Sequence, residues 1–193
     1  MTIFSKLYEQ VMQKSAHPKA PLYLSGLSFS ESSFFPIPPD VMLMPMCLAK
    51  PERALYFAWL TTLFSVLGGI LGYAIGYFAM DAITPTIESM GYLPKLEHAQ
   101  AFFDEYGVWV VFIAGFSPIP YKVFTISAGA SAMAFLPFVI ASIVGRGARF
   151  YLVALLMKFG GHKIEPMIKQ WVDWLGWGMV LLIAAYIAYK MSV

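Results

Sequence analysis

Apolar residues gather in long blocks along the chain, with polar stretches between them. Residues 54–80 form an apolar block without proline, and residues 135–159 form a second block of similar length. Each block is long enough to cross the roughly 30 Å hydrocarbon core of a bilayer as a helix. Residues 171–189 form a third block, with tryptophans near one end and tyrosines near the other, as in membrane-spanning helices. This pattern predicts an all-α integral membrane protein.

Two further apolar blocks, 22–48 and 107–134, are interrupted by prolines and charged residues. Because proline ends a helix, each leg has about a dozen residues and reaches about 18 Å, which is too short to span. We therefore predict that both blocks are re-entrant hairpins, which enter and leave the bilayer on one side. A similar motif breaks each block: Pro36-Ile37-Pro38-Pro39-Asp40-Val41 in the first and Pro118-Ile119-Pro120-Tyr121-Lys122-Val123 in the second. The motif prolines are Pro36, Pro38, Pro118 and Pro120.

The order of the blocks predicts a single membrane domain, residues 1–193, that contains an inverted repeat. A hairpin and a helix occupy 22–80, and a second hairpin and helix occupy 107–159. The last apolar block, 171–189, is an additional C-terminal transmembrane helix. A polar connection, 81–105, joins the two repeats and contains a short interfacial helix.

Charged residues orient this topology. With two hairpins, the N-terminus lies on the same side as Lys50, Arg53 and the lysines between 158 and 169, while the acidic connection lies on the other. Positive charge concentrates on the cytoplasmic side of membrane proteins, so the N-terminus is predicted to be cytoplasmic. Lys190 then lies outside, against this tendency. Residues 1–20 have the periodicity of an amphipathic helix on the membrane surface, although a frayed tail fits equally well.

The composition narrows the classes of function. The chain is 59% hydrophobic and 12% charged, whereas soluble domains carry about 25% charged residues. Its net charge of +2 gives no reason to expect a nucleic-acid partner. The single cysteine, Cys47, excludes an internal disulfide, and the three histidines form no metal-binding spacing with it. No nucleophile–base set or nucleotide-binding loop is visible, so we expect neither an enzyme nor a bound cofactor or metal.

Five ionisable residues lie inside the apolar blocks, where a charge is costly and usually functional. They are Glu31, Asp40, Lys122, Arg146 and Arg149. Arg146 and Arg149 are three positions apart and share a helix face, and Lys122 follows a proline break where a half-helix can begin. Arginines and helix N-termini bind anions, so the three bases are predicted to bind an anionic headgroup. The two acids are predicted to bind protons or cations, or to hold the arginines when no ligand is present.

Each of these residues also has a purely structural explanation. Asp40 can cap the helix that follows Pro39, Lys122 can extend to the interface, and the arginines can be fixed counter-ions of the acids. A strip of glycines on the 54–80 helix leaves two options, tight packing against another helix or a gliding surface for lipid, and it permits a homodimer. The strip consists of Gly68, Gly72 and Gly76.

The proline motifs and their surroundings resemble the DedA family, also described as VTT or SNARE-associated-like proteins, and in particular its YqaA-type branch. The matching residues are Glu31, Pro36-Ile37-Pro38-Pro39-Asp40 and Gly115-Phe116-Ser117-Pro118-Ile119-Pro120-Tyr121-Lys122-Val123-Phe124-Thr125-Ile126-Ser127-Ala128-Gly129. The resemblance covers about residues 22–160. It implies a multi-pass protein of the bacterial inner (cytoplasmic) membrane, in which Glu31 and Asp40 are the two acids that flank the first proline loop.

The resemblance also implies a function in lipid transport. The family includes translocases that recycle polyprenyl phosphate and proteins linked to maintenance of the membrane potential, and it is similar to eukaryotic lipid scramblases. Lys122 approximates the family's arginine after the second proline motif, and Arg146 or Arg149 matches a further arginine on the next helix. The arginine before that motif has no counterpart, because Gly115 or Phe116 stands there. This departure points to a different lipid or a different dependence on protons.

We therefore expect a transporter that flips or scrambles an anionic lipid, such as polyprenyl phosphate or a phospholipid. Coupling to protons or sodium would act through Asp40 or Glu31. Two alternatives remain, a proton-coupled exporter of small cations bound by these acids and a membrane scaffold that transports nothing.

Overall fold

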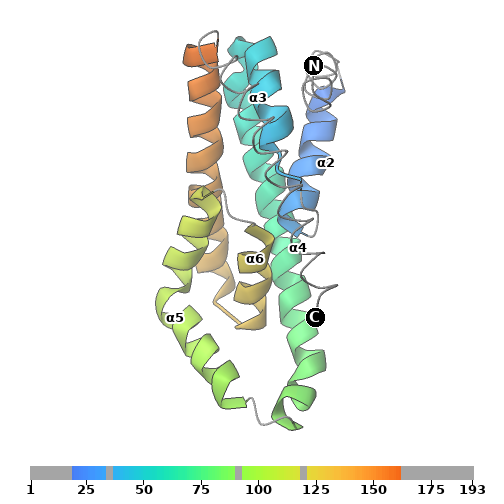
Figure 1. Cartoon of the computed structure of the whole chain (residues 1–193), viewed down its shortest axis with the longest axis vertical. Coiled ribbons are helices and arrows are strands. Elements are labelled where there is room, and N and C mark those ends of the chain that lie inside the picture. The colour runs from blue at the N-terminus through green and yellow to red at the C-terminus, as the bar shows by residue number, and fades with distance from the viewer. Residues whose placement is uncertain (1–18, 34–36, 90–92, 118–120, 162–193) are drawn as a thin grey trace, which may run out of the picture.

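The computed structural model describes residues 19–33, 37–89, 93–117 and 121–161, and these ranges contain helices and no strand (Figure 1). The helices are α2 (Ala20–Ser33), α3 (Asp40–Ala49), the short 3-10 helix η1 (Pro51–Arg53), α4 (Ala54–Ser89), α5 (Leu93–Phe116), α6 (Tyr121–Ala130) and an unlabelled final helix, Phe135–Gly161, drawn in orange. The all-helical prediction is confirmed for this part of the chain. The predicted span 171–189 and residues 1–18 lie outside it.

Two stretches in the described ranges are long and apolar enough to cross a membrane, Pro51–Met80 and Phe135–Gly161. They correspond to the two full spans predicted at 54–80 and 135–159. The final helix begins two residues before Pro137 because proline is tolerated in the first turn, where its missing N–H would have no helical partner.

Four shorter elements lie beside these long helices. In Figure 1, α2 and α3 lie along the upper half of α4, and α6 lies along its lower half beside α5. The two pairs, α2 with α3 and α5 with α6, approach the middle of the molecule from opposite ends. At 1.5 Å per residue, the 14 residues of α2 and the 10 residues of α3 reach about 21 Å and about 15 Å.

The connection predicted at 81–105 is helical on both sides of residues 90–92, rather than a polar linker with one short helix. Helix α4 continues past residue 80 to Ser89 and includes Pro85, and α5 begins at Leu93 and continues without interruption to Phe116. Hydropathy shows where a helix leaves apolar surroundings, but backbone hydrogen bonding continues into polar sequence. The predicted boundaries at 80 and 107 were therefore wrong as helix ends.

The glycine strip of α4 packs against α2 and α6. A side chain at Gly68 would collide with the carbonyl group of Phe29 in α2, and one at Gly76 would collide with that of Ile126 in α6. Gly129 of α6 makes the reciprocal approach to the carbonyl group of Tyr73. Close backbone approach is the ordinary use of such strips in membrane helices. Tight packing is thus confirmed, and the gliding surface for lipid is wrong because neighbouring helices cover the strip.

Two apolar clusters form the core on either side of the middle. One contains Leu24, Leu43, Met46, Phe57 and Phe150, which come from α2, α3, α4 and the final helix. The other contains Val111, Tyr121, Ala128, Met133 and Phe138, which come mainly from α5, α6 and the final helix. The candidate site lies between these clusters.

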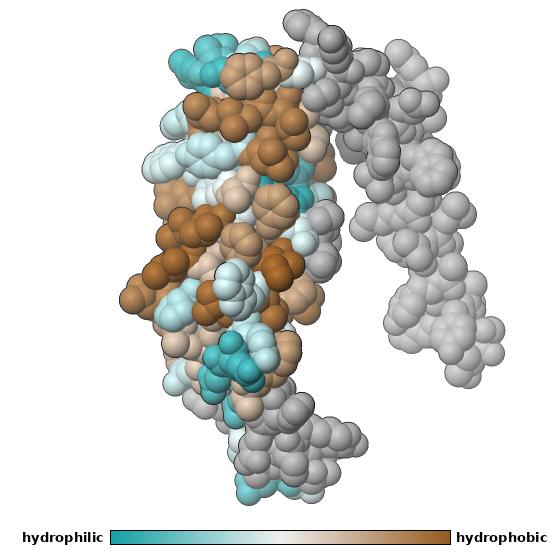
Figure 2. Space-filling view, turned by 90° about the vertical axis from the view of Figure 1, so that its left-hand side faces the viewer, coloured by the Kyte–Doolittle hydropathy of each residue, from teal (hydrophilic) through white to brown (hydrophobic). Residues whose placement is uncertain are grey.

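The outside of the helical bundle is also largely apolar. The face in Figure 2 is mostly hydrophobic between polar regions near its upper and lower ends. Large apolar side chains on α4, α5 and the final helix are exposed, among them Trp59, Ile113, Ile140, Leu156 and Phe159. A soluble monomer seldom exposes so many large apolar residues, whereas a lipid-facing surface requires them.

Candidate functional site

Arg146 lies in the middle of the final helix and is only 1% exposed. Its Nη2 forms an ion pair with Oε2 of Glu31 at 2.5 Å, and its Nε donates a hydrogen bond to Oγ of Ser65 at 2.5 Å. A longer bond of 3.2 Å runs from Nη2 to Oγ of Ser32. The guanidinium group thus connects the final helix to α2 and α4.

Two hydroxyl groups complete this polar cluster. Oγ of Ser32 donates to Oε2 of Glu31 at 2.9 Å and lies 2.7 Å from Oγ of Ser65. Ser32 and Ser65 are both fully buried. A buried charge is tolerated when it is paired and its hydrogen bonds are satisfied, and this cluster meets both conditions for Arg146.

Aromatic rings enclose the same guanidinium group. Its Cζ atom lies 4.8 Å from the ring centre of Tyr121 and 4.7 Å from that of Phe150, within the range of cation–π attraction. Tyr121 is the first residue of α6, and its hydroxyl donates to Oγ of Ser142 at 2.5 Å. Through Tyr121 the second helix pair also contacts Arg146.

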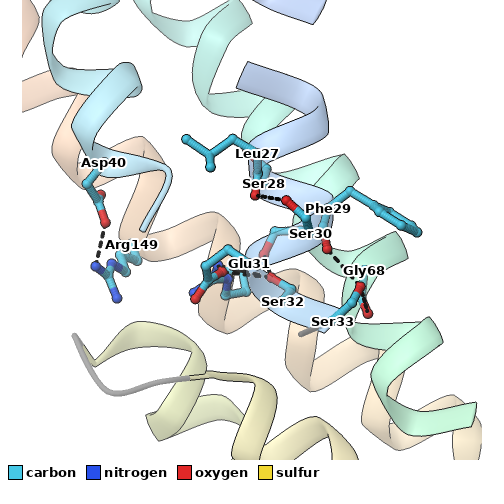
Figure 3. A network of polar contacts seen from close by, with 12 residues as sticks. Leu27, Ser28, Phe29, Ser30, Glu31, Ser32, Ser33, Asp40, Gly68 and Arg149 are labelled. Atoms are coloured by element: carbon cyan, nitrogen blue, oxygen red, sulfur yellow. Dashed lines mark hydrogen bonds and ion pairs between the residues drawn. The ribbon is translucent and has the colours of Figure 1, made fainter. Parts of the chain in front are cut away.

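Arg149, one turn further along the final helix, forms a second ion pair. Its Nη2 lies 2.6 Å from Oδ2 of Asp40, the first residue of α3, and its Nη1 donates to the carbonyl oxygen of Ser117 at 2.5 Å. Ser117 directly follows α5, so this pair connects α3 to the end of α5. The Asp40 and Arg149 side chains are 13% and 16% exposed. Figure 3 shows this pair apart from the group around Glu31.

The sequence predicted both acids and both arginines, and the structure brings all four together as two pairs. The counter-ion role considered for the arginines matches this geometry. Asp40 is the first residue of α3, and Pro39 occupies the N-cap position. Among the described residues, Oδ1 of Asp40 has no hydrogen-bond partner and its Oδ2 accepts from Arg149, so the side chain does not cap the helix. Lys122 is the second residue of α6 and is half-buried. The motif prolines Pro36, Pro118 and Pro120 lie outside the described residues, and Pro38 lies just before α3.

Sequence reasoning missed the uncharged members of the site. Ser32, Ser65 and Tyr121 hold Arg146 or its partner, and the Ser117 carbonyl holds Arg149. An ionisable residue stands out in an apolar helix, whereas a serine there is common. A signal was present in α2, where a run of serines surrounds Glu31 in an otherwise apolar segment.

Gly115 stands where the resemblance expects an arginine. A Cβ atom there would lie 3.3 Å from the backbone nitrogen of Arg146 and 3.4 Å from the backbone of Gly145. On the other side of the same contact, a side chain at Gly145 would collide with the carbonyl oxygen of Phe112 in α5. Helix α5 and the final helix therefore approach closely at this point.

Comparison with known proteins identifies the family of this chain. No solved structure matches the chain. An uncharacterized protein of Haemophilus influenzae is 49% identical over 98% of this chain and 97% of its own length. A protein of Histophilus somni, described as a homologue of an uncharacterized protein, is 46% identical over 98% of this chain and 100% of its own length. The VTT domain matches residues 34–159, which include Asp40 and both arginines. The chain belongs to the VTT domain family, which is the DedA family.

Proposed function

We propose that this protein translocates an anionic lipid across a bacterial inner membrane, with the headgroup passing the two arginine–carboxylate pairs. Members of the VTT family are membrane-associated and are generally regarded as transporters. The lipid, the inner membrane and the multi-pass topology are our proposal.

The observation that carries the proposal is the pair of ion pairs inside an apolar helical bundle. Arg146 joins α2, α4 and α6, whereas Arg149 joins α3 and the end of α5. Charges at membrane depth are costly, and those that persist usually face a substrate path. Both pairs lie where the two helix pairs approach each other, which is where transporters with inverted repeats bind substrate.

The shortness of α2 and α3 supports a re-entrant arrangement. At about 21 Å and about 15 Å, neither reaches across a core of about 30 Å. We propose that α2 and α3 enter from the cytoplasmic side, where the N-terminus lies, and that α5 and α6 enter from the opposite side. Headgroups from either leaflet would then reach the arginines, while the acyl chains stay along the apolar outer face.

Arginine suits a phosphate-bearing lipid because its planar donors match phosphate oxygens. Polyprenyl phosphate and anionic phospholipids both have such a headgroup. Each acid would hold its arginine when no lipid is bound, and uptake of a proton or sodium ion by one of the acids, Asp40 or Glu31, would couple lipid movement to an ion gradient.

A liposome assay tests this function. Purified protein is reconstituted with a headgroup-labelled anionic lipid, and an impermeant quencher measures movement between leaflets. We expect the wild type to speed movement, and Asp40→Ala and Arg149→Gln to slow it at least about tenfold, because each leaves its partner unpaired. The control is Arg53→Gln, which removes an exposed arginine from η1. Equal rates for all four proteins would contradict the proposal.

A scaffold is the second candidate, because each acid already forms an ion pair with an arginine. If the pairs only hold helices together, wild-type protein will move lipid no faster than empty liposomes. The cation exporter is less well supported, because both acids already contact arginines. Uptake of a dye cation driven by a pH gradient, without lipid movement, would favour it.

A further inference from the structure

The two arginines differ in how tightly their surroundings hold them. Arg146 is 1% exposed, bonds through both Nε and Nη2, and lies between the rings of Tyr121 and Phe150. To leave Glu31, it would have to break contacts with three helices at once. Such a group is fixed.

Arg149 is held more loosely. Its side chain is 16% exposed, and among the described residues its polar contacts are Oδ2 of Asp40 and the Ser117 carbonyl. The ring of Phe150 lies 6.0 Å away, at the edge of the cation–π range. Asp40 contributes one oxygen to the pair, since its buried Oδ1 has no hydrogen-bond partner among the described residues. Oδ2 of Asp40 accepts from one donor, Nη2 of Arg149, whereas Oε2 of Glu31 accepts from two, Nη2 of Arg146 and the hydroxyl of Ser32. The Asp40 carboxylate is therefore the easier of the two to displace.

We propose that Asp40–Arg149 is the exchangeable pair, in which a lipid phosphate displaces the Asp40 carboxylate from Arg149, while Glu31–Arg146 stays closed as a fixed anchor. This inference rests on the proposed function. A phosphate oxygen takes the place of Oδ2 on Nη2. The bond from Nη1 to the Ser117 carbonyl keeps the guanidinium group oriented during the exchange. No covalent bond changes.

The exchange also connects binding to helix movement. Asp40 is the first residue of α3, and Arg149 is the group that joins it to the end of α5. Helices α2, α4 and α6, by contrast, are held by glycine contacts and by Arg146. Displacement of Asp40 therefore releases α3 from α5 without loosening the α2–α4–α6 core.

Binding to the purified full-length protein in a neutral detergent tests the division of roles. The probes are a short-chain lipid phosphate monoester, inorganic phosphate and a short-chain phosphocholine lipid, and the readout is the dissociation constant. Because Asp40 competes with the phosphate, Asp40→Asn should bind the lipid monoester about tenfold more tightly, a gain of about 1.4 kcal/mol. Arg149→Gln should lose binding.

Three further variants complete the experiment. Glu31→Gln should not tighten binding and should lower the thermal unfolding temperature, because it disrupts the anchor. Glu52→Gln, an exposed change on η1, is the control and should behave as wild type. Asp40→Ala should also bind the lipid monoester about tenfold more tightly. It takes the place of Asp40→Asn if the asparagine variant does not fold.

The outcomes separate this inference from the proposed function. If the wild type binds the lipid monoester but neither Asp40 variant tightens binding, or Glu31→Gln tightens it equally, the exchange at Asp40 is wrong and lipid transport still stands. If inorganic phosphate bound as tightly as the lipid monoester, the ligand would be free phosphate and not a lipid headgroup. If the wild-type protein bound none of the three probes, both the exchange at Asp40 and the proposed function would be wrong.

Discussion

Several buried polar and aromatic contacts converge on the side chain of Arg146. A carboxylate, two hydroxyl groups and two aromatic rings surround it, from three helices besides its own. These partners offset the free-energy cost of burying the charge of Arg146. If one partner is removed, the desolvation penalty of the guanidinium group remains while part of the compensation is lost. At the residue scale, the uncharged members of the cluster should therefore matter for stability.

Ser65→Ala should lower the free energy of unfolding by about 1–3 kcal/mol, because Nε of Arg146 then loses its acceptor in a buried place. Thermal unfolding in detergent measures the effect. The matched control is Ser30→Ala, whose exposed hydroxyl bonds only to carbonyls of its own helix, at Gly26 and Leu27. Ser65→Thr keeps a hydroxyl and should restore part of the loss. If both alanine variants unfold at the same temperature, the role given to Ser65 is wrong.

The sequence predicts which charges matter but not how they pair. Glu31, Asp40, Arg146 and Arg149 stand out because charged residues are rare in apolar blocks. Glu31 and Arg146 are 115 positions apart, and spacing along the chain says nothing about which acid meets which arginine at that separation. The pairing depends on the packing of α2 and α3 against the final helix, which is a tertiary property.

At the scale of helices, glycines determine which elements pack closely. Gly68 and Gly76 let the backbones of α2 and α6 approach α4, and Gly129 does the same from α6. The four-residue spacing predicted a flat face on the 54–80 helix, but not the partners that cover it. The hydropathy pattern also could not predict that α4 ends at Ser89 and that α5 begins at Leu93. The sequence turns polar before these ends, while helical hydrogen bonding continues.

Gly76→Ala should destabilise the protein by about 1–3 kcal/mol, since the added methyl group meets a backbone carbonyl that cannot rotate away. Gly26→Ala is the control, because this exposed glycine of α2 has open space around it. That change should leave stability unaltered or raise it by about 0.5–1 kcal/mol through helix propensity. Thermal unfolding of the two variants compares them directly. Equal destabilisation would mean that the close approach of α4 to α6 does not hold the bundle.

On the scale of the whole molecule, two long helices accompany two helix pairs that meet from opposite ends (Figure 1). The proline motifs predicted where the short helices break, because proline lacks a backbone N–H group and disfavours helical geometry in the residue before it. Helices α3 and α6 begin at Asp40 and Tyr121, directly after the last proline of each motif. In the proposed topology, helix length decides which helix ends share one side of the membrane. Pro51–Met80 reaches about 45 Å, whereas α2 and α3, at about 21 Å and about 15 Å, are each shorter than the bilayer core.

Single cysteines can locate three positions relative to the membrane: Lys19→Cys before α2, Glu52→Cys before α4 and Glu88→Cys near the end of α4. All three side chains are exposed, and the natural Cys47 is buried, so the unmodified protein gives the background. An impermeant thiol reagent, applied to intact and then opened cells, should label Lys19→Cys and Glu52→Cys from the cytoplasmic side and Glu88→Cys from outside. This result is expected because, in the proposed topology, α2 and α3 return to the side that they enter, whereas α4 crosses. Labelling of Lys19→Cys and Glu52→Cys from opposite sides would show that the first block spans the bilayer, and the two arginines would then no longer lie where hairpins meet.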